Sequence, residues 1–396
     1  MHCAEPELST PSLSHGRVAA RLPHRTSVVS ILIPGGYCDD DEVGIDGFAH
    51  LREHWALHAV SAVVAPARIV RRSARTLRST TELDLVVSGP CEVDADTVLD
   101  ELRGYPEFDR VGEIEKIADE VHRARAHTSA TAVDLELPRS TGWSSGWGYG
   151  DPVRLVQVST DEFHRLVDDT WSGIRPVVST AAVASLAAEW PTADELPAAL
   201  PADRDLEVAP SRAEDDGNAE YHRAAVGWVV RYRSPAGTAI VDDCLRFLGS
   251  FAVPAVRQRF PDLAINFRLG QFGERFTSAE SDLVVAWVQR ADGTTRADTI
   301  RAYLDALFAT ARGLLEDEAI PLGALHNRRR LDAVLHGADV LAYARWRSRA
   351  AHLGLGQDHP YLCPPGRAHF AEFTALLQLL DALASAGFVL VDGGGR

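Results

Sequence analysis

A stretch near the middle of the chain lacks the hydrophobic periodicity of a helix or a strand. Residues 190–218 contain four prolines and a cluster of acidic residues, as an interdomain linker does. At 396 residues the chain is also longer than one ordinary hydrophobic core supports. We therefore expect a disordered leader at 1–16, a first domain at 17–189, a linker at 190–218 and a second domain at 219–396.

Strand and helix signals follow a similar order in the two parts. The patterns predict strands at 17–22, 27–34, 80–88 and 153–158 and helices at 48–57, 94–103, 113–127 and 160–171. In the second part they predict strands at 224–232, 264–269 and 283–289, a helix at 241–251 and further helices from 296 onward. This order favours a weak internal duplication.

Charge and cysteine content narrow the class of protein. The formal charge of −16 repels phosphate backbones and anionic lipid, which argues against nucleic acid or a membrane as the main partner. Five scattered cysteines without CxxC spacing predict no disulfide framework, and no apolar run is long enough for a membrane span, so we expect a cytoplasmic protein. One basic run is interpreted as a solvated face: Arg68, Arg71, Arg72, Arg75 and Arg78.

The segment HLREH at 50–54 carries the chemistry. His50 and His54 are four residues apart, so on a helix both imidazoles project from one face within reach of a single metal ion. Glu53 precedes the second histidine, where its carboxylate can act as general base toward a water molecule without taking a coordination site. This H-x-x-E-H order predicts a hydrolytic zinc site.

A catalytic zinc ion usually has three protein ligands, so a third is needed. Glu113 and Glu120 are the candidates, because they are seven apart and share one face of the predicted helix at 113–127. The residues alone leave two interpretations open, a metal ligand with its supporting carboxylate or an ordinary acidic surface stripe.

Several segments together resemble the pitrilysin or insulinase-type metallopeptidases, which include the mitochondrial processing peptidases. The resemblance runs from about residue 17 to 183 and rests on Gly35-Gly36-Tyr37, the segment GFAH at 47–50, the HLREH helix and the segment EIEKIADE at 113–120. It implies that Glu120 is the third zinc ligand, that Glu113 supports the site, and that Ser79-Thr80-Thr81 is an edge-strand segment where Thr80 contacts substrate.

The resemblance also implies a fold and a way of working. The fold is α+β, with two tandem α/β-roll domains, each a mostly antiparallel sheet covered by helices. In this family an Arg and a Tyr in the second half often grip the substrate; here Arg257 matches the Arg, whereas Ile265 or Phe267 stands in place of the Tyr. We therefore expect this chain to be the zinc-bearing subunit of a pair. Its homologous partner would supply the Arg and Tyr that grip the substrate.

The expected function is a zinc-dependent endopeptidase that cleaves short or unfolded peptides, with removal of a leader or propeptide as the favoured reaction. Two alternatives remain: a non-catalytic peptide-binding or scaffold subunit of the same fold, and a structural zinc site. A structural site is ordinarily closed by four protein ligands rich in Cys, and the sequence offers no such fourth ligand.

Overall fold

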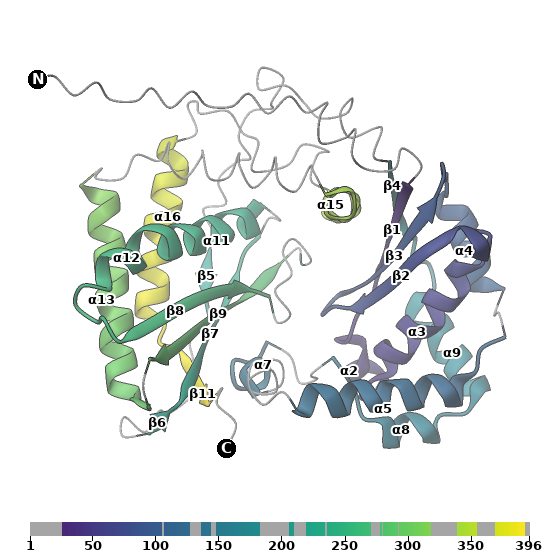
Figure 1. Ribbon diagram of the computed structural model, residues 1–396, viewed down its shortest axis with the longest axis horizontal. Coiled ribbons are helices and arrows are strands. Elements are labelled where there is room, and N and C mark those ends of the chain that lie inside the picture. Colours follow the sequence, from purple (N-terminus) through teal and green to yellow (C-terminus); the bar gives the residue numbers. More distant parts are fainter. Residues whose placement is uncertain are drawn as a thin grey trace, which may run out of the picture.

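The computed structural model shows two α+β halves whose sheets face each other (Figure 1). The structure describes residues 26–104, 107–126, 136–143, 148–182, 206–209, 219–233, 236–270, 278, 280–291, 293–317, 339–354 and 369–392. The predicted leader, the strand at 17–22 and most of the linker at 190–218 lie outside these residues.

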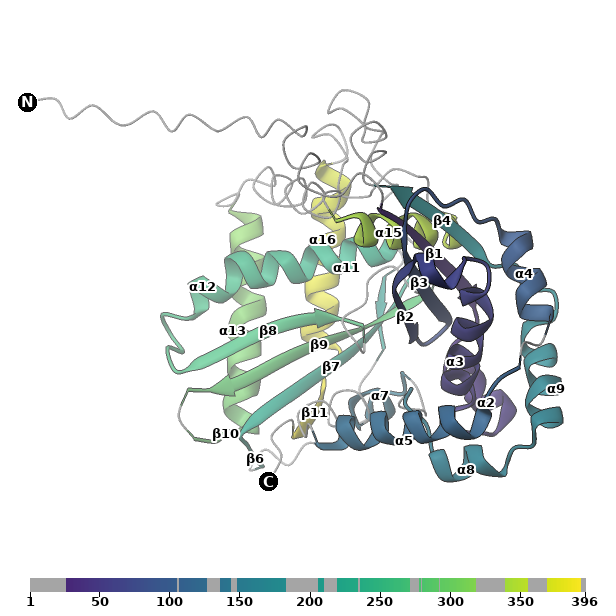
Figure 2. The same cartoon turned by 45° about the vertical axis from the view of Figure 1, so that its right-hand side comes forward.

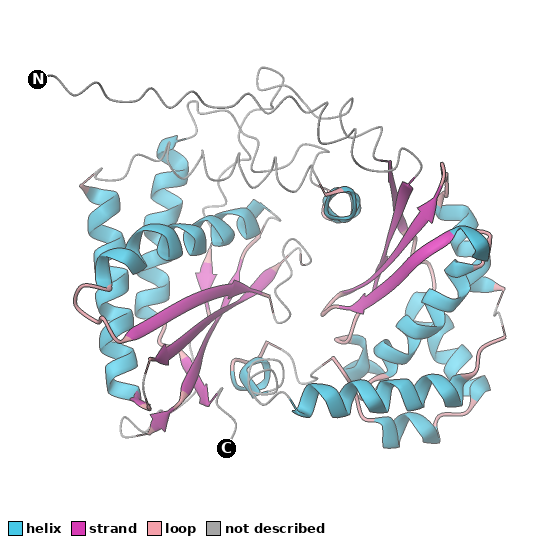
Figure 3. Ribbon diagram, viewed as in Figure 1, coloured by secondary structure: helices cyan, strands magenta, loops and turns pink. Residues whose placement is uncertain are grey.

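The first half is built on an antiparallel sheet in the order β2-β3-β1-β4. Its strands are β1 (Thr26–Pro34), β2 (Ile69–Thr76), β3 (Thr80–Ser88) and β4 (Val177–Ala182). Helices lie together against one face (Figure 3), namely α2 (Asp39–Val43), α3 (Phe48–Ser61), α4 (Ala95–Arg103), α5 (Arg110–Ala126), α8 (Pro152–Gln157) and α9 (Thr160–Trp171), with the short turn η1 (Pro66–Arg68) before β2.

The core of this half lies between the sheet and α3. Alternate strand residues such as Ile31, Leu83 and Leu85 contact Phe48 and Trp55 of the helix, and all are almost fully buried. The central strands are buried on both faces, whereas β2 is mostly exposed or half-buried, with Thr76 as its one buried residue. Within the described residues β2 pairs only with β3 and forms an edge of the sheet.

The second half repeats this arrangement with the sheet order β11-β7-β9-β8. Its strands are β7 (Arg223–Arg231), β8 (Leu263–Leu269), β9 (Ser281–Arg290) and β11 (Val389–Asp392), with short pairings of β5 (Glu207–Val208), β6 (Glu220–Tyr221) and β10 (Thr295–Arg296). The covering helices are α11 (Ala236–Phe247), the π-helical turn η3 (Leu248–Ala252), α12 (Val253–Val256), α13 (Ala297–Glu316) and α16 (His369–Ser385).

Each sheet is also contacted on its other face by a segment from the opposite half (Figure 2). Helix α15 (Val340–His352) packs against β1 and β4, with Ala344 in a small cluster with Val28 and Ala181. Conversely, α7 (Leu137–Ser140) packs against β7 and β11, where Leu137 is fully buried. The two halves therefore exchange short elements across the space between them.

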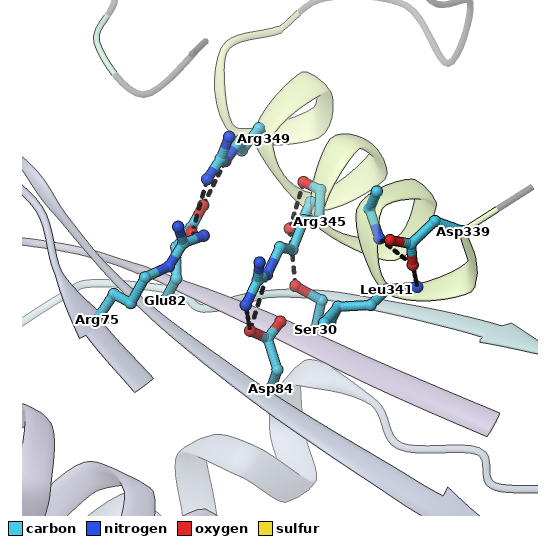
Figure 4. Close-up of polar contacts among 10 residues, drawn as sticks. Ser30, Arg75, Glu82, Asp84, Asp339, Leu341, Arg345 and Arg349 are labelled. Carbon is cyan, nitrogen blue, oxygen red and sulfur yellow. Dashed lines mark hydrogen bonds and ion pairs between the residues drawn. The ribbon is translucent and has the colours of Figure 1, made fainter. Parts of the chain in front are cut away.

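Ion pairs fasten α15 to the first sheet (Figure 4). Arg345 donates to Asp84 at 2.6 and 2.9 Å, and Arg349 pairs with Glu82, which also accepts from Arg75. Glu82 is fully buried and Asp84 is 1% exposed. Buried carboxylates need such partners, because removing a charge from water without compensation costs several kcal/mol, on the order of 3–5 for one left unpaired.

The α+β prediction with two tandem, helix-covered antiparallel sheets is confirmed, with two local corrections. The predicted strand at 153–158 is wrong, because Asp151 caps a helix there by accepting from Val153 N at 3.0 Å, with proline in the first turn. The expected edge at Ser79–Thr81 is also wrong, since β3 lies between β2 and β1. No described helix combines the length and apolar character needed to cross a bilayer.

Candidate metal centre

A buried carboxylate fixes the start of α3. Asp40 accepts hydrogen bonds from the backbone N–H groups of Gly47 and Ala49 at 2.8 and 2.7 Å, which satisfies donors that a helix leaves unpaired at its first turn. Burial raises the pKa of Asp40 to about 7. Gly47 has φ of 94°, and a Cβ there would lie 2.7 Å from Cα of Gly150, so the glycine loop packs directly on the helix start.

The two motif histidines project from α3 side by side. Their ring centroids are 4.9 Å apart. The Nδ1 atom of His50 lies 2.9 Å from the backbone carbonyl oxygen of Tyr149, and Nδ1 of His54 lies 2.8 Å from Oε2 of Glu113. Since both acceptors favour a proton on Nδ1, Nε2 of each ring is the nitrogen suited to bind a metal ion, and Nε2 of His50 lies 3.3 Å from Oε2 of Glu120.

Glu53 lies beside the histidines and is 7% exposed. Its Oε2 accepts a hydrogen bond of 2.7 Å from the hydroxyl of Thr76 at the end of β2. One ligand atom from each of His50, Glu53 and His54 lies within 4.8 Å of the others. The strand thus fixes the rotamer of a carboxylate that the helix places next to two imidazoles.

Helix α5 brings two more carboxylates to this group. Oε2 of Glu120 lies 3.3 Å from Nε2 of His50, and Glu113 contacts His54 and Lys116. Burial alone would lower the pKa of His50, but the hydrogen bond with Glu120 and the charge of Glu53 raise it to about 9. The negative charge that favours a proton on His50 would equally favour a divalent cation between the two side chains.

These side chains line a cavity of about 550 Å³ at the junction of α3, α5, β2 and the glycine loop. Its wall is formed by the motif residues, by edge-strand residues and by part of the glycine loop: His50, Glu53, His54, Leu57, His58, Arg72, Ser73, Ala74, Arg75, Thr76, Leu77, Glu113, Lys116, Glu120, Gly148 and Tyr149. A small substrate segment therefore has direct access to the imidazoles and to Glu53.

The donor set fits a divalent metal ion. Two imidazole nitrogens with their other nitrogen hydrogen-bonded, together with a carboxylate, are ligands typical of zinc and related metals. Partners on Nδ1 hold each ring in one orientation, which is common at histidine metal sites. The structure thus brings together all four residues proposed for metal binding and catalysis, His50, Glu53, His54 and Glu120, with Glu113 behind His54.

Two weaker sequence predictions lie elsewhere. Thr80 is fully buried in an interior strand and does not line the cavity. Arg257 is exposed at the end of α12 in the second half and is not part of the cavity wall either. Conversely, the sequence analysis missed Thr76 and Tyr149, because their contacts depend on long-range packing that no local spacing reveals.

Comparison with known proteins identifies the fold. No protein-family model matches the chain, and no curated protein sequence matches it significantly. Among solved structures, a protease from Helicobacter pylori matches with a TM-score of 0.60 at 13% identity, over 93% of this chain and 94% of that one.

Two further structures match over most of this chain. Pitrilysin matches with a TM-score of 0.56 at 13% identity, over 92% of this chain and 42% of its own, so the chain spans less than half of pitrilysin. A chain of complex III2 from Candida albicans matches with a TM-score of 0.54 at 10% identity, over 92% and 90%. The chain has the pitrilysin-type fold, as its sequence resemblance predicted.

Proposed function

We propose that the chain is a zinc-dependent endopeptidase acting on short or unfolded peptides. One observation carries the proposal: two imidazoles, each held by a partner at Nδ1, lie beside Glu120 and beside a buried carboxylate that Thr76 holds in place. A non-catalytic fold needs neither the oriented imidazoles nor the anchored carboxylate.

His50, His54 and Glu120 are the proposed zinc ligands. When bound, zinc would polarise the scissile carbonyl group and make a nearby water molecule more acidic. Glu113 holds the His54 ring through Nδ1, and the Tyr149 carbonyl does the same for His50. The remaining side of the cavity is left for substrate.

Glu53 is the proposed general base. Because the Thr76 hydroxyl occupies one of its oxygens, the other oxygen is available to take a proton from water and to deliver it to the leaving amine. The carboxylate is almost fully buried, so little bulk water competes for that proton.

The substrate would extend the first sheet. Strand β2 has a free edge within the described residues and passes along the cavity from Arg72 to Thr76. An extended peptide can pair with such an edge through its backbone, which favours unfolded segments such as a leader or propeptide. This geometry supports cleavage at a bond in the interior of the substrate peptide rather than at one of its ends.

We also propose that a homologous partner subunit completes the substrate grip. The motive is that Arg257 is exposed and distant from the cavity wall, and that Ile265 and Phe267 offer no hydroxyl group. Peptidase activity that appears only when the chain is mixed with such a partner would support this arrangement. Full activity of the isolated chain, sedimenting as a monomer or homodimer, would contradict it.

A second candidate is a non-catalytic peptide-binding or scaffold subunit. The match to a chain of complex III2 favours it, because that structure shares the fold over nearly all of this chain. Such a subunit would bind peptide but would not cleave it, even with zinc bound and the homologous partner subunit present.

Zinc content tests the proposal directly. The purified chain should hold about one zinc ion, and His50→Ala or His54→Ala should release it, because one imidazole and one carboxylate retain the metal poorly. His58→Ala is the matched control, since His58 lines the same cavity one turn further along α3 but lies outside the group of close ligand atoms. Unchanged zinc content in both ligand variants would contradict the assignment.

A further inference from the structure

The five arginines at positions 68–78 have different roles in the structure, although the sequence places them in one run. Arg68 donates to the backbone carbonyl groups of Ser88 and Pro90. Arg75 pairs with Glu82 (Figure 4). The Arg78 guanidinium lies 4.4 Å from the ring centroid of Trp143 and donates to the carbonyl oxygen of that residue at 3.1 Å. These three arginines stabilise the fold.

Arg71 and Arg72 differ from the other three. Both are exposed, and neither forms a hydrogen bond or ion pair with another residue in the part of the chain that the structure describes. They are adjacent on the free edge of β2. Two uncompensated guanidinium groups on a protein of formal charge −16 form a local positive site.

The register of β2 places these two side chains on opposite faces of the sheet. Arg72 lies opposite Leu85, whose side chain belongs to the core under α3, so Arg72 is on the face of the sheet that carries the metal centre. Arg71 lies opposite Val86, which packs toward α15 on the other face. In agreement with this, Arg72 lines the cavity and Arg71 does not.

The other cations of the cavity wall have partners. Lys116 contacts Glu113, and Arg75 contacts Glu82. Arg72 is therefore the guanidinium group of the described wall that is left to meet a ligand. Because guanidinium groups bind carboxylates in a two-pronged geometry, an acidic side chain is the matching ligand.

We propose that Arg72 makes the site selective for peptides that carry an acidic residue near the cleaved bond, an inference that rests on the proposed function. In a peptide paired with β2, the residue aligned with Arg72 places its side chain on the same face of the sheet, about 5 Å away between Cβ atoms. A glutamate or aspartate there meets the free guanidinium group.

The position of this residue follows from the strand. Thr76, which contacts the proposed base, is four residues beyond Arg72, and a strand rises about 3.3 Å per residue. The acidic residue therefore lies within about four residues of the cleaved bond. An acidic residue one position away points to the opposite face of the sheet, where it aligns with Arg71 or Ser73 instead.

The test measures binding separately from cleavage. Fluorescently labelled, unstructured peptides that differ by one Glu or Gln at successive positions are titrated against the zinc-loaded chain carrying Glu53→Gln. We expect the Glu peptide of the aligned position to bind roughly two- to fivefold tighter than its Gln counterpart, as for an exposed cross-strand charge pair, and the preference to fall at high salt.

Matched variants assign the preference to one side chain. Arg72→Gln should abolish it and Arg72→Glu should reverse it in favour of Lys, whereas Arg71→Gln removes the same charge and should retain it. Equal binding of Glu and Gln peptides at every position, or a preference unchanged in Arg72→Gln, would overturn the inference. If the parent chain cleaves no peptide even when it is mixed with a homologous partner, but the binding preference is present, the proposed activity fails while the role of Arg72 stands.

Discussion

The strands β3 and β9 occupy the same place in their sheets, and each buries a carboxylate near its start. Glu82 of β3 faces α15 and pairs with Arg75 and Arg349. Burial alone would raise the pKa of Glu82, but these arginines lower it to about 2. Asp282 of β9 meets the Tyr232 hydroxyl at 3.1 Å, and burial raises its pKa to about 6. The first sheet thus uses charge to hold a distant helix, whereas the second buries its acid among hydroxyl groups.

The helices behind the two sheets differ in the kind of polar residue that they bury. On α3 the buried residues include His50, Glu53 and Arg52, whose guanidinium group pairs with Asp39 at 2.6 Å. On α11 the buried residues include the apolar Val241 and Cys244 and the carboxylates of Asp242 and Asp243, and Asp242 pairs with Arg246 at 2.7 Å. Both helices therefore bury paired charge, but within the described residues only α3 places two imidazoles and a carboxylate close enough to hold one metal ion.

The largest effect should come from the base. Glu53→Gln should lower peptidase activity on the order of 10²–10⁴-fold and retain zinc and fold, because an amide cannot take a proton from water at neutral pH. Asp282→Asn is the matched control from the second half and should leave the rate unchanged. Activity is measured on an unstructured fluorogenic peptide, in the assembly in which the parent is active. Equal rates for Glu53→Gln and the parent would show that Glu53 is not the base, and that the first half does not differ from the second in this function.

Removing an arginine of α15 should have the next largest effect. Arg349→Ala leaves Glu82 fully buried with Arg75 as its remaining ion-pair partner in the described structure, so the free energy of unfolding should fall by about 3 kcal/mol. Arg347→Ala on the same helix should cost less, about 1 kcal/mol, because Arg347 lies 5.9 Å from the ring centroid of Tyr343 and such a cation–π contact contributes about 0.5–1 kcal/mol. Urea denaturation checks both values, and equal losses would show that α15 is not held by this pair.

Much of the fold was predictable because it follows from local patterns. Apolar β-prone runs specify β1 and β3, and the serine that caps α9 marks its start at Thr160. The segment at 153–158 was misassigned because a capping Asp followed by proline outweighs its valines. The attachment of α15 to the first sheet depends on pairs separated by more than 260 residues, which no periodicity records.

The candidate site was predictable to the same extent. The spacing of His50, Glu53 and His54 is local on one helix, so it could be interpreted directly. The spacing made Glu113 and Glu120 candidates, the resemblance assigned their roles, and the structure places both at the cavity. Thr76 and Arg72 come from a strand whose edge position depends on sheet order, so their roles emerge only from the assembled sheet.

A pH series should separate the two buried carboxylates. The pKa of Asp282 is raised from 3.8 to about 6 in the folded chain, so its contribution to stability is fully present below pH 3.8 and is lost as pH rises through 6. Asp282→Asn should therefore be more stable than the parent at pH 7, by roughly 1–3 kcal/mol, and this advantage should shrink toward pH 4.

Glu82 should behave in the opposite way. Its pKa is lowered from 4.5 to about 2, so its contribution is present above pH 4.5 and is lost as pH falls toward 2. Urea denaturation of the parent, Asp282→Asn and Glu82→Gln between pH 2 and 7 gives both trends. A stability difference between parent and Asp282→Asn that does not vary with pH would contradict the contrast between the sheets.

The smallest effect should come from the carboxylate behind the metal centre. Glu113 accepts from Nδ1 of His54 and contacts Lys116, and these hydrogen bonds outweigh burial and lower its pKa. Glu113→Gln keeps the shape and one acceptor oxygen but removes the charge that makes the imidazole a stronger ligand, so zinc affinity should fall about tenfold. Glu115→Gln is the control, because it makes the same charge change on the exposed face of α5.

Competition with a chelator of known affinity measures both variants. Equal zinc affinity for parent and Glu113→Gln would show that the contact with His54 only packs α5 against α3. A tenfold loss with the fold intact would show instead that α5 supports the metal centre. In the second half, α13 makes apolar contacts around Ile300, Leu304 and Leu307 instead. The two halves would then differ in the helices that surround the site as well as in the motif itself.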